Sequence, residues 1–303
     1  MSDDDREKIT LSTVRGRVGD LVDAGAAAPA VPGRTLPLRV ELVRQLRRRR
    51  TQVAYALVAA LPVILWIAFT LGGEQDGPTE GPSLVDLASG SAGNFTVFAM
   101  FASANFLLVV LVALFFGDTV ASEASWSSLR YLLAVPVPRA RLLRQKAVVS
   151  AALSLAALVL LPVVALLVGS LAYGAGDLVS PAGESLTFGA AVPRILLGTL
   201  YLAVHLSWVA GLALLLSVST DAPLGAVGGA VMASIVSQIL DQITALGTIR
   251  DFLPTHYADA WSALLAVDVD WGDITRGAFS AVCYAALFMT AAAWHFTRKD
   301  ITS

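Results

Sequence analysis

The sequence predicts an all-α polytopic membrane protein with six transmembrane helices and both termini in the cytoplasm. Its 303 residues are 56% apolar and 15% charged, whereas soluble domains are about 45–50% apolar and about 25% charged. Six apolar runs, each with at most one charged residue, have about the 20 residues or more that a helix needs to cross a bilayer. Lys and Arg gather in alternate connections between these runs, as they do in cytoplasmic loops. Together these observations exclude a soluble domain.

Residues 1–36 are polar, mixed in charge and too poor in large apolar residues to fold a core. We expect a disordered cytoplasmic tail. Its first residues, MSDDDREKIT, are acidic where a secretory signal is basic, and no short apolar core with a cleavage site follows them. The first apolar run is therefore expected to act as an uncleaved anchor.

A basic amphipathic helix is expected over residues 37–52. Leu38, Leu42 and Leu46 recur every four residues, while arginines occupy the other faces. Such a helix can lie flat in the membrane interface, where each basic residue gains about 1 kcal/mol from anionic headgroups. The arginines can also act as a basic flank that fixes topology, and the two roles are compatible.

The apolar runs define a single membrane domain over residues 53–303. We expect spans at about 53–71, 95–116, 147–173, 192–217, 224–246 and 274–296. The connection between the first two runs holds four acids and no base, and the next connection holds five bases. Of the 21 Lys and Arg residues, all but Arg194, Arg250 and Arg276 fall in segments that this topology places in the cytoplasm.

The second cytoplasmic connection carries the most specific motif, GDTVASEASWSSLRYLLAVPVPRARLLRQK, at residues 117–146. Gly and Glu precede Leu-Arg-x-Leu-Leu, which is followed by Pro-Val-x-Arg and Leu-Leu-x-x-Lys. These positions are Gly117, Glu123, Leu129, Arg130, Leu132, Leu133, Pro136, Val137, Arg139, Leu142, Leu143 and Lys146. The motif resembles the cytoplasmic signature of type-2 ATP-binding-cassette (ABC) transporter permeases. The resemblance extends from about residue 37 to the end, because the basic helix before the first run and the C-terminal segment FTRKDI at residues 296–301 also fit.

In that family the segment is a coupling helix that docks on a separate ATPase subunit. The resemblance implies an exporter in a bacterial cell (plasma or inner) membrane, with two ABC ATPase copies and a second permease half, as a homodimer or a heterodimer. It places ATP and Mg²⁺ on the ATPase, so we expect this chain to be no enzyme, to hold no cofactor or metal, and to contact lipids but no nucleic acid. The coupling residues that it implies are Glu123, Trp126, Leu129, Arg130, Leu133, Arg139 and Arg141.

The periodicity of the segment agrees with a docking helix. Trp126, Leu129 and Leu133 share one helix face. Pro136 and Pro138 end that helix, and Pro138 can open the next one. The alternative is an amphipathic loop helix that packs on the membrane.

ATP hydrolysis by this chain is not expected. A phosphate-binding loop needs a Gly-rich turn before a Lys, and none of the three lysines, Lys8, Lys146 and Lys299, follows one. The zinc-protease pattern HExxH and the serine-hydrolase pattern GxSxG are also missing. The single cysteine, Cys283, lies in an apolar run, which leaves no cysteine metal cluster.

Polar side chains at membrane depth are costly and often functional. Because the family places the second and fifth spans of two halves around the substrate path, Asn105, Gln238 and Asp241 are the candidate lining residues. The alternative is interhelical hydrogen bonding, worth about 0.6–2 kcal/mol each. That structural role is the one we expect for His205, which has no second metal ligand near it in sequence.

The fifth run begins with Gly225 and Gly229 in GxxxG spacing, which lets another helix approach closely. The partner can be the second permease half or a helix of the same chain. Both alternatives remain open.

The last outer connection, at residues 249–271, is too long for a simple turn, and its aromatic residues predict a dip into the outer leaflet. His256 with Asp251 and Asp259 matches no metal spacing, so solvated acids are expected there. Two other functions compete. A secondary transporter would show helices broken at the midplane and charged coupling-ion sites, and a membrane-embedded enzyme would cluster carboxylates or histidines at membrane depth.

Overall fold

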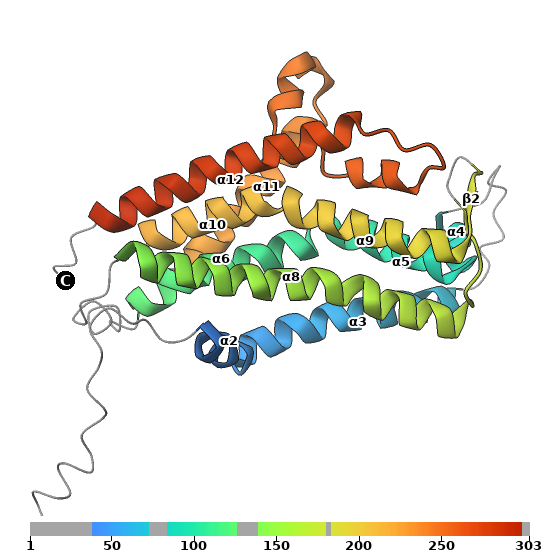
Figure 1. Ribbon diagram of the computed structural model, residues 1–303, viewed down its shortest axis with the longest axis horizontal. Coiled ribbons are helices and arrows are strands. Elements are labelled where there is room, and N and C mark those ends of the chain that lie inside the picture. Colours follow the sequence, from blue (N-terminus) through green and yellow to red (C-terminus); the bar gives the residue numbers. More distant parts are fainter. Residues whose placement is uncertain (1–37, 73–83, 126–138, 180–182, 299–303) are drawn as a thin grey trace, which may run out of the picture.

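Helices make up almost all of the computed structural model, which describes residues 38–72, 84–125, 139–179 and 183–298. The long helices run side by side in an elongated bundle (Figure 1). The helix α2 and the last residues of α12 lie toward one end of this bundle, which we call the basic end. The strands β1 (Leu178–Val179) and β2 (Ser185–Leu186) pair antiparallel at the other, the hairpin end.

Five helical segments of the described chain are long and apolar enough to cross a membrane. These are α3 (Arg49–Gly72), α8 (Arg139–Ala172), the consecutive pair α9 (Phe188–His205) and α10 (Ser207–Ser219), α11 (Pro223–Asp241) and α12 (Gly272–Arg298). A sixth crossing is present if α5 (Ala92–Ala104) and α6 (Leu107–Ser125) count as one span. The expected all-α polytopic membrane protein is therefore confirmed.

The predicted second span at 95–116 is not one straight helix. It bends by 54° between α5 and α6, where Asn105 ends α5. The hydroxyl of Ser103 donates to the carbonyls of Ala99 and Met100, a side-chain interaction that weakens and bends helices. The predicted fourth span at 192–217 is interrupted by the single turn residue Leu206 between α9 and α10, but it continues as one span without a bend above 40°. Continuous apolar sequence cannot distinguish a broken span from an intact one.

Other boundaries differ at the helix ends. The expected basic helix at 37–52 divides into α2 (Leu38–Leu46), a turn and the first residues of α3. The predicted fifth span at 224–246 ends at Asp241, because the chain turns into the 3₁₀ helix η1 (Thr244–Phe252). Within η1, Gly247 adopts φ 53°, a left-handed conformation that favours glycine. The predicted tail at 1–36 lies outside the described residues.

The helix α2 turns its polar side chains inward. Glu41 and Gln45 are buried, whereas Leu38, Val40 and Val43 are exposed. Apolar side chains on the outside and polar ones against the protein are the arrangement expected for a helix that lies in the membrane interface.

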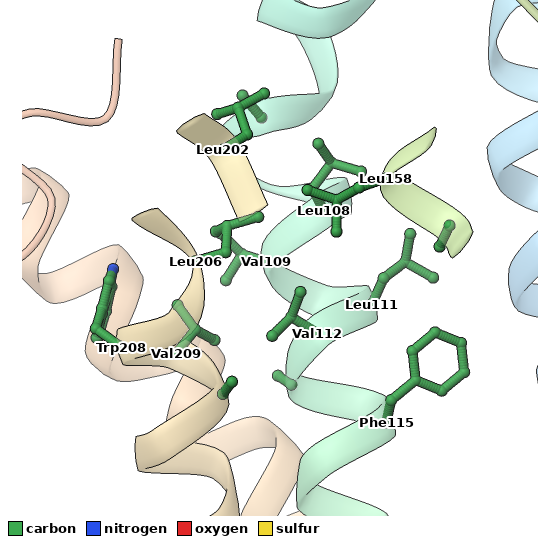
Figure 2. Packing of buried hydrophobic residues seen from close by; sticks show 14 of the residues in the cluster. Leu108, Val109, Leu111, Val112, Phe115, Leu158, Leu202, Leu206, Trp208 and Val209 are labelled. Atoms are coloured by element: carbon green, nitrogen blue, oxygen red, sulfur yellow. The ribbon is translucent and has the colours of Figure 1, made fainter. Parts of the chain in front are cut away.

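The helix α6 lies at the centre of the bundle and packs against α8, α10 and α11. Figure 2 shows its buried side chains interleaved with those of neighbouring helices; the labelled residues are Leu108, Val109, Leu111, Val112, Phe115, Leu158, Leu202, Leu206, Trp208 and Val209. Near the basic end, Gly117 permits a close approach to α11. A Cβ atom at Gly117 would lie 3.0 Å from Cγ2 of Val227 and 3.1 Å from its backbone nitrogen.

Part of the connection from α11 to α12 packs against the bundle, whereas η1 has no buried residue and projects from it. Its 3₁₀ helices, η1 and η2 (Ala260–Leu265), stop short of the hairpin end in Figure 1. Trp261 of η2 is fully buried against Phe101 and Gly198, and Arg194 donates to the carbonyls of Leu264 and Ala266. Trp261, the buried aromatic side chain of this connection, therefore packs against other residues of the protein. The small helix α4 (Leu84–Ser89) precedes α5 at the hairpin end.

Candidate functional site

The coupling residues implied by the sequence divide into two groups. Trp126, Leu129, Arg130 and Leu133 lie outside the described residues. The other three flank the undescribed segment: Glu123 is buried near the end of α6, and Arg139 and Arg141 lie in the first turn of α8. Nη1 of Arg139 donates to the carbonyl of Thr297, 3.4 Å away, near the end of α12.

A buried ion pair joins the two sides of this segment. Oε1 of Glu123 lies 2.6 Å from Nζ of Lys146, and the two residues are only 6% and 4% exposed. The ammonium group also donates to the carbonyl of Thr119, 3.3 Å away. Buried charges are tolerated when they are paired and hydrogen-bonded. The helices α6 and α8 are therefore tied together at the point where the chain leaves and returns.

The helix α2 joins this cluster through Arg44. Its guanidinium group lies 3.3 Å from Oε1 of Glu123 and 2.7 Å from Oε1 of Glu41. Gln45 donates to the same Glu41 oxygen at 3.0 Å. Burial raises the pKa of Glu41, but the hydrogen bonds from Arg44 and Gln45 outweigh it and hold the pKa below its ordinary value. Glu41 is thus a permanent negative charge on the buried face of α2.

Asp118 of α6 binds two further arginines. Arg50 forms an ion pair with its Oδ1, and Arg48 lies 3.6 Å from its Oδ2. Burial lowers the pKa of Arg48, as does the nearby charge of Arg50, and the Asp118 carboxylate opposes that shift. We name the whole group the basic-end network; it consists of Glu41, Arg44, Gln45, Arg48, Arg50, Asp118, Glu123 and Lys146.

The basic-end network changes the role expected for part of the arginine-rich segment. From the sequence, we expected the arginines of this segment to contact lipid headgroups, but Arg44, Arg48 and Arg50 face carboxylates of the same chain. Other arginines of the segment, such as Arg39 and Arg47, are exposed and can still meet headgroups. The available signal for this pairing was that Asp118 and Glu123 follow an apolar run on the side of the membrane where the arginine-rich segment was expected.

The structure brings together two of the three candidate path residues. Nε2 of Gln238 donates to the backbone carbonyl of Asn105 at 2.9 Å and to Oγ of Ser234 at 3.2 Å. The Asn105 carbonyl lies at the break between α5 and α6, so the Gln238 amide compensates for a disturbed helical hydrogen-bond pattern. Nδ2 of Asn105 also donates to Oδ1 of Asp259, 3.4 Å away. Burial raises the pKa of Asp259, and this hydrogen bond partly offsets the rise.

Asp241, the third candidate, belongs to a separate charged group. Its Oδ1 lies 2.6 Å from Nδ1 of His256 and 3.6 Å from Nε of Arg250. Nε2 of His256 lies 3.4 Å from Oδ1 of Asp251. The contacts of Asp241 with His256 and Arg250 hold the segment after α11 against the end of that helix. Within the part of the chain that the structure describes, no cluster of three or more His, Cys, Asp or Glu residues suits a metal ion.

A small cavity lies where the broken span α5–α6 and the junction of α9 and α10 meet α11. Its wall includes Asn105 at the break, His205 and Leu206 at the junction, and Gln238 of α11; the other lining residues are Ala104, Val109, Leu202, Trp208, Ser234, Thr255 and Ala258. It has room for about one water molecule. His205 was expected to hydrogen-bond between helices, but its Nδ1 has no hydrogen-bond partner among the described residues. Its ring stacks on Tyr201, with the ring centres 5.9 Å apart.

The two glycines of the fifth run have different surroundings. A Cβ atom at Gly229 would lie 3.0 Å from Cδ1 of Leu216, on α10 of the same chain. Gly225 is exposed, and a Cβ atom there would approach only Ala222 of its own turn. The buried face of α11 consists instead of Ala226, Ala230, Ser234 and Ser237.

Residues 84–302 match the model of one protein family, whose description is "Protein of unknown function (DUF2705)". The matched part begins at α4 and extends beyond α12, so it includes the broken span α5–α6, the Glu123–Lys146 ion pair and the cavity. A comparison with curated proteins gives no match.

Proposed function

We propose that this chain, which belongs to the DUF2705 family, is the membrane-spanning permease subunit of an ATP-driven ABC transporter. It works as an exporter in a bacterial cell membrane. Two copies of a separate ATPase bind ATP and Mg²⁺, and a second permease half completes the pathway. The connection at residues 117–146 transmits the movement of the ATPase to the spans.

The basic-end network is the observation that carries this proposal. The connection leaves α6 and returns through α8, and the 2.6 Å contact between Glu123 and Lys146 links these helices at its base. Arg44 adds α2 to the same unit. A buried ion pair gives little net stability compared with apolar packing, but it does fix one geometry. A force on the connection would therefore move α2, α6 and α8 as one body.

The distribution of charge supports a cytoplasmic basic end. The Lys and Arg residues of α2, α3 and α8 and Arg298 at the end of α12 lie there, whereas the only bases of the described chain on the other side are Arg194, Arg250 and Arg276. The hairpin side is acidic; its acids include Asp86, Asp177, Glu184, Asp251, Asp259, Asp268, Asp270 and Asp273. Because Lys and Arg favour cytoplasmic loops, this asymmetry supports both termini in the cytoplasm.

The positions of the first and last described helices support six crossings. Both α2 and the end of α12 lie toward the basic end in Figure 1, so the number of crossings between them is even. Counting α5 and α6 as one broken span gives six. Six spans are half of a transport pathway in the type-2 ABC permeases that the sequence resembles, which agrees with the second permease half that we propose.

Purification from native membranes tests the coupling. Wild-type protein is expected to co-purify with Mg²⁺-dependent ATPase activity, and the double substitution Trp126→Ala with Arg130→Glu should remove at least about nine-tenths of it, a loss equivalent to about 1.4 kcal/mol or more. Arg276→Glu is the control, because Arg276 is highly exposed on the opposite side. Wild-type protein that brings no ATPase with it, or a double variant that retains all activity, would overturn the proposal.

A secondary transporter is the second candidate, because a broken span, as at Asn105 between α5 and α6, is a feature of that class. None of the described residues that line the adjoining cavity is Asp, Glu, Lys or Arg, which disfavours a charged coupling-ion site there. Transport in vesicles separates the two classes. An ABC permease requires ATP and continues after a protonophore has collapsed the proton gradient, whereas a proton-coupled transporter stops.

A further inference from the structure

Two buried ring nitrogens beside the junction of α9 and α10 have no hydrogen-bond partner among the described residues. They are Nδ1 of His205 and Nε1 of Trp208. His205 is 3% exposed and Trp208 is 2% exposed, and both residues line the cavity between α6, α9, α10 and α11. In Figure 2 the ring nitrogen of Trp208 lies on the side of the ring away from Val112 and Phe115. Buried polar groups are nearly always satisfied, so the pair points to a ligand.

The lining of the cavity selects a neutral ligand. Its polar members are Asn105, Ser234, Gln238 and Thr255, together with the two rings. A charged group would be buried here without an opposite charge among the lining side chains, which is strongly unfavourable. The room for about one water molecule limits the polar part of the ligand to a single small group.

The chemistry of the two nitrogens selects a hydroxyl group. Trp208 Nε1–H can only donate, and Nδ1 of a neutral histidine accepts or donates according to its tautomer. A hydroxyl group within reach of both rings would accept from Trp208 and could donate its hydrogen to His205. If His205 carries its proton on Nδ1, the oxygen still has lone pairs for both donors.

We propose that this cavity is a subsite for one neutral hydroxyl group, which belongs either to a water molecule or to an otherwise apolar cargo. Apolar wall residues such as Val109, Leu202 and Leu206 suit the carbon atoms next to such a group. On the outside, Phe106 and Ile239 are exposed next to Asn105 and Gln238. Opening of the 2.9 Å contact between Gln238 and Asn105 would connect the cavity with the lipid. Only the cargo alternative rests on the proposed function.

The test observes His205 directly in protein reconstituted in lipid nanodiscs with ¹⁵N-labelled histidine. The chain has three histidines, so the single variants His256→Gln and His295→Gln assign the remaining ring signal to His205 without altering it. The probes are hexadecanol, hexadecylamine and palmitate at equal mole fractions in the lipid. We expect the ring of His205 to be neutral, with a hydrogen bond at Nδ1. We also expect hexadecanol to half-saturate the shift at a mole fraction at least about tenfold below that of the charged probes, a difference that corresponds to about 1.4 kcal/mol in binding free energy.

The possible results separate the two sources of the hydroxyl group. A saturable shift with hexadecanol alone identifies a cargo subsite, and a hydrogen-bonded Nδ1 that ignores all three probes identifies water; both support the proposal. A charged ring, an Nδ1 without a hydrogen bond, or an equal response to the amine or the carboxylate overturns it. Ala104→Leu, which adds bulk to the cavity wall and keeps the His205 reporter, should abolish the response of His205 to hexadecanol, and a response that persists also overturns the cargo assignment. No ATPase takes part, so the result is independent of the coupling test.

Discussion

Replacing Lys146 with Met should destabilise the basic end of the bundle. The substitution keeps an unbranched side chain but removes the ammonium group that lies 2.6 Å from Glu123 and 3.3 Å from the carbonyl of Thr119. Glu123 then stays buried without the ammonium group, while Arg44 remains 3.3 Å from its Oε1. Moving α6 away from α8 or protonating the carboxylate would relieve the charge.

The expected loss in the free energy of unfolding is about 3 kcal/mol, the lower end of the roughly 3–5 kcal/mol measured when one partner of a buried ion pair is removed. Arg44 keeps the loss at that lower end. The double variant Lys146→Met with Glu123→Gln removes both charges. Its loss in the free energy of unfolding should be about 1–2 kcal/mol smaller than the sum of the two single losses, since contacting residues are coupled.

Unfolding of the reconstituted protein, followed by a steric-trapping assay in lipid bicelles, measures these free energies. Arg144→Met is the matched control, because Arg144 is exposed on the same helix and its loss should stay within about 0.5 kcal/mol. A loss below about 1 kcal/mol for Lys146→Met, or a double variant that equals the sum of the singles, would show that the pair does not hold α6 and α8 together.

Three other predictions concern packing, pH and topology. Gly117→Ala forces α6 away from α11 and should lower the free energy of unfolding by about 1–3 kcal/mol. Gly228→Ala should not lower it, because nothing lies within 4 Å of the added Cβ. Equal losses for the two variants would contradict the close packing at Gly117. Because the folded pKa of Glu41 is lowered, its stabilisation is present above the unfolded pKa of about 4.3 and is lost as pH falls through the folded value. Glu41→Gln should therefore flatten acid unfolding below about pH 4, and an unchanged pH profile would refute this. With the native cysteine replaced, Asp177→Cys should react with an impermeant thiol reagent in intact cells and Ser219→Cys only after permeabilisation; the opposite pattern would reverse the topology.

The sequence predicted the membrane helices because bilayer thickness imposes a length and a polarity on each of them. Five of the six expected spans correspond to helical segments of sufficient length, and the sixth is the broken pair. The break at Asn105 and the interruption at Leu206 could not be predicted from an apolar run. They depend on partners distant in sequence, such as Gln238, which donates to the Asn105 carbonyl from 133 residues away.

The candidate sites were predictable in composition but not in pairing. Asn105 and Gln238 were selected as polar residues at membrane depth, and they are in contact. The role of Asp241 was different, because the segment after α11 brings His256 and Arg250 beside it. The arginines of the 37–52 segment looked like lipid contacts, since their carboxylate partners Asp118 and Glu123 lie some 70 residues further along the chain. Charge patterns identify the side of a membrane but not the partner of each charge.

On the proposed function, α6 connects the two candidate sites mechanically. Between Glu123 and the break it is an uninterrupted helix of about 25 Å, at 1.5 Å per residue. The 54° bend at its other end gives α6 and α5 different axes, so a tilt of α6 need not tilt α5 by the same angle. A tilt of about 5° about the Glu123 end would move the Asn105 end by about 2 Å, enough to break its 2.9 Å hydrogen bond with Gln238. A straight second span would need α5 and the whole hairpin end to move as well, so the break gives the basic-end network a short route to the cavity.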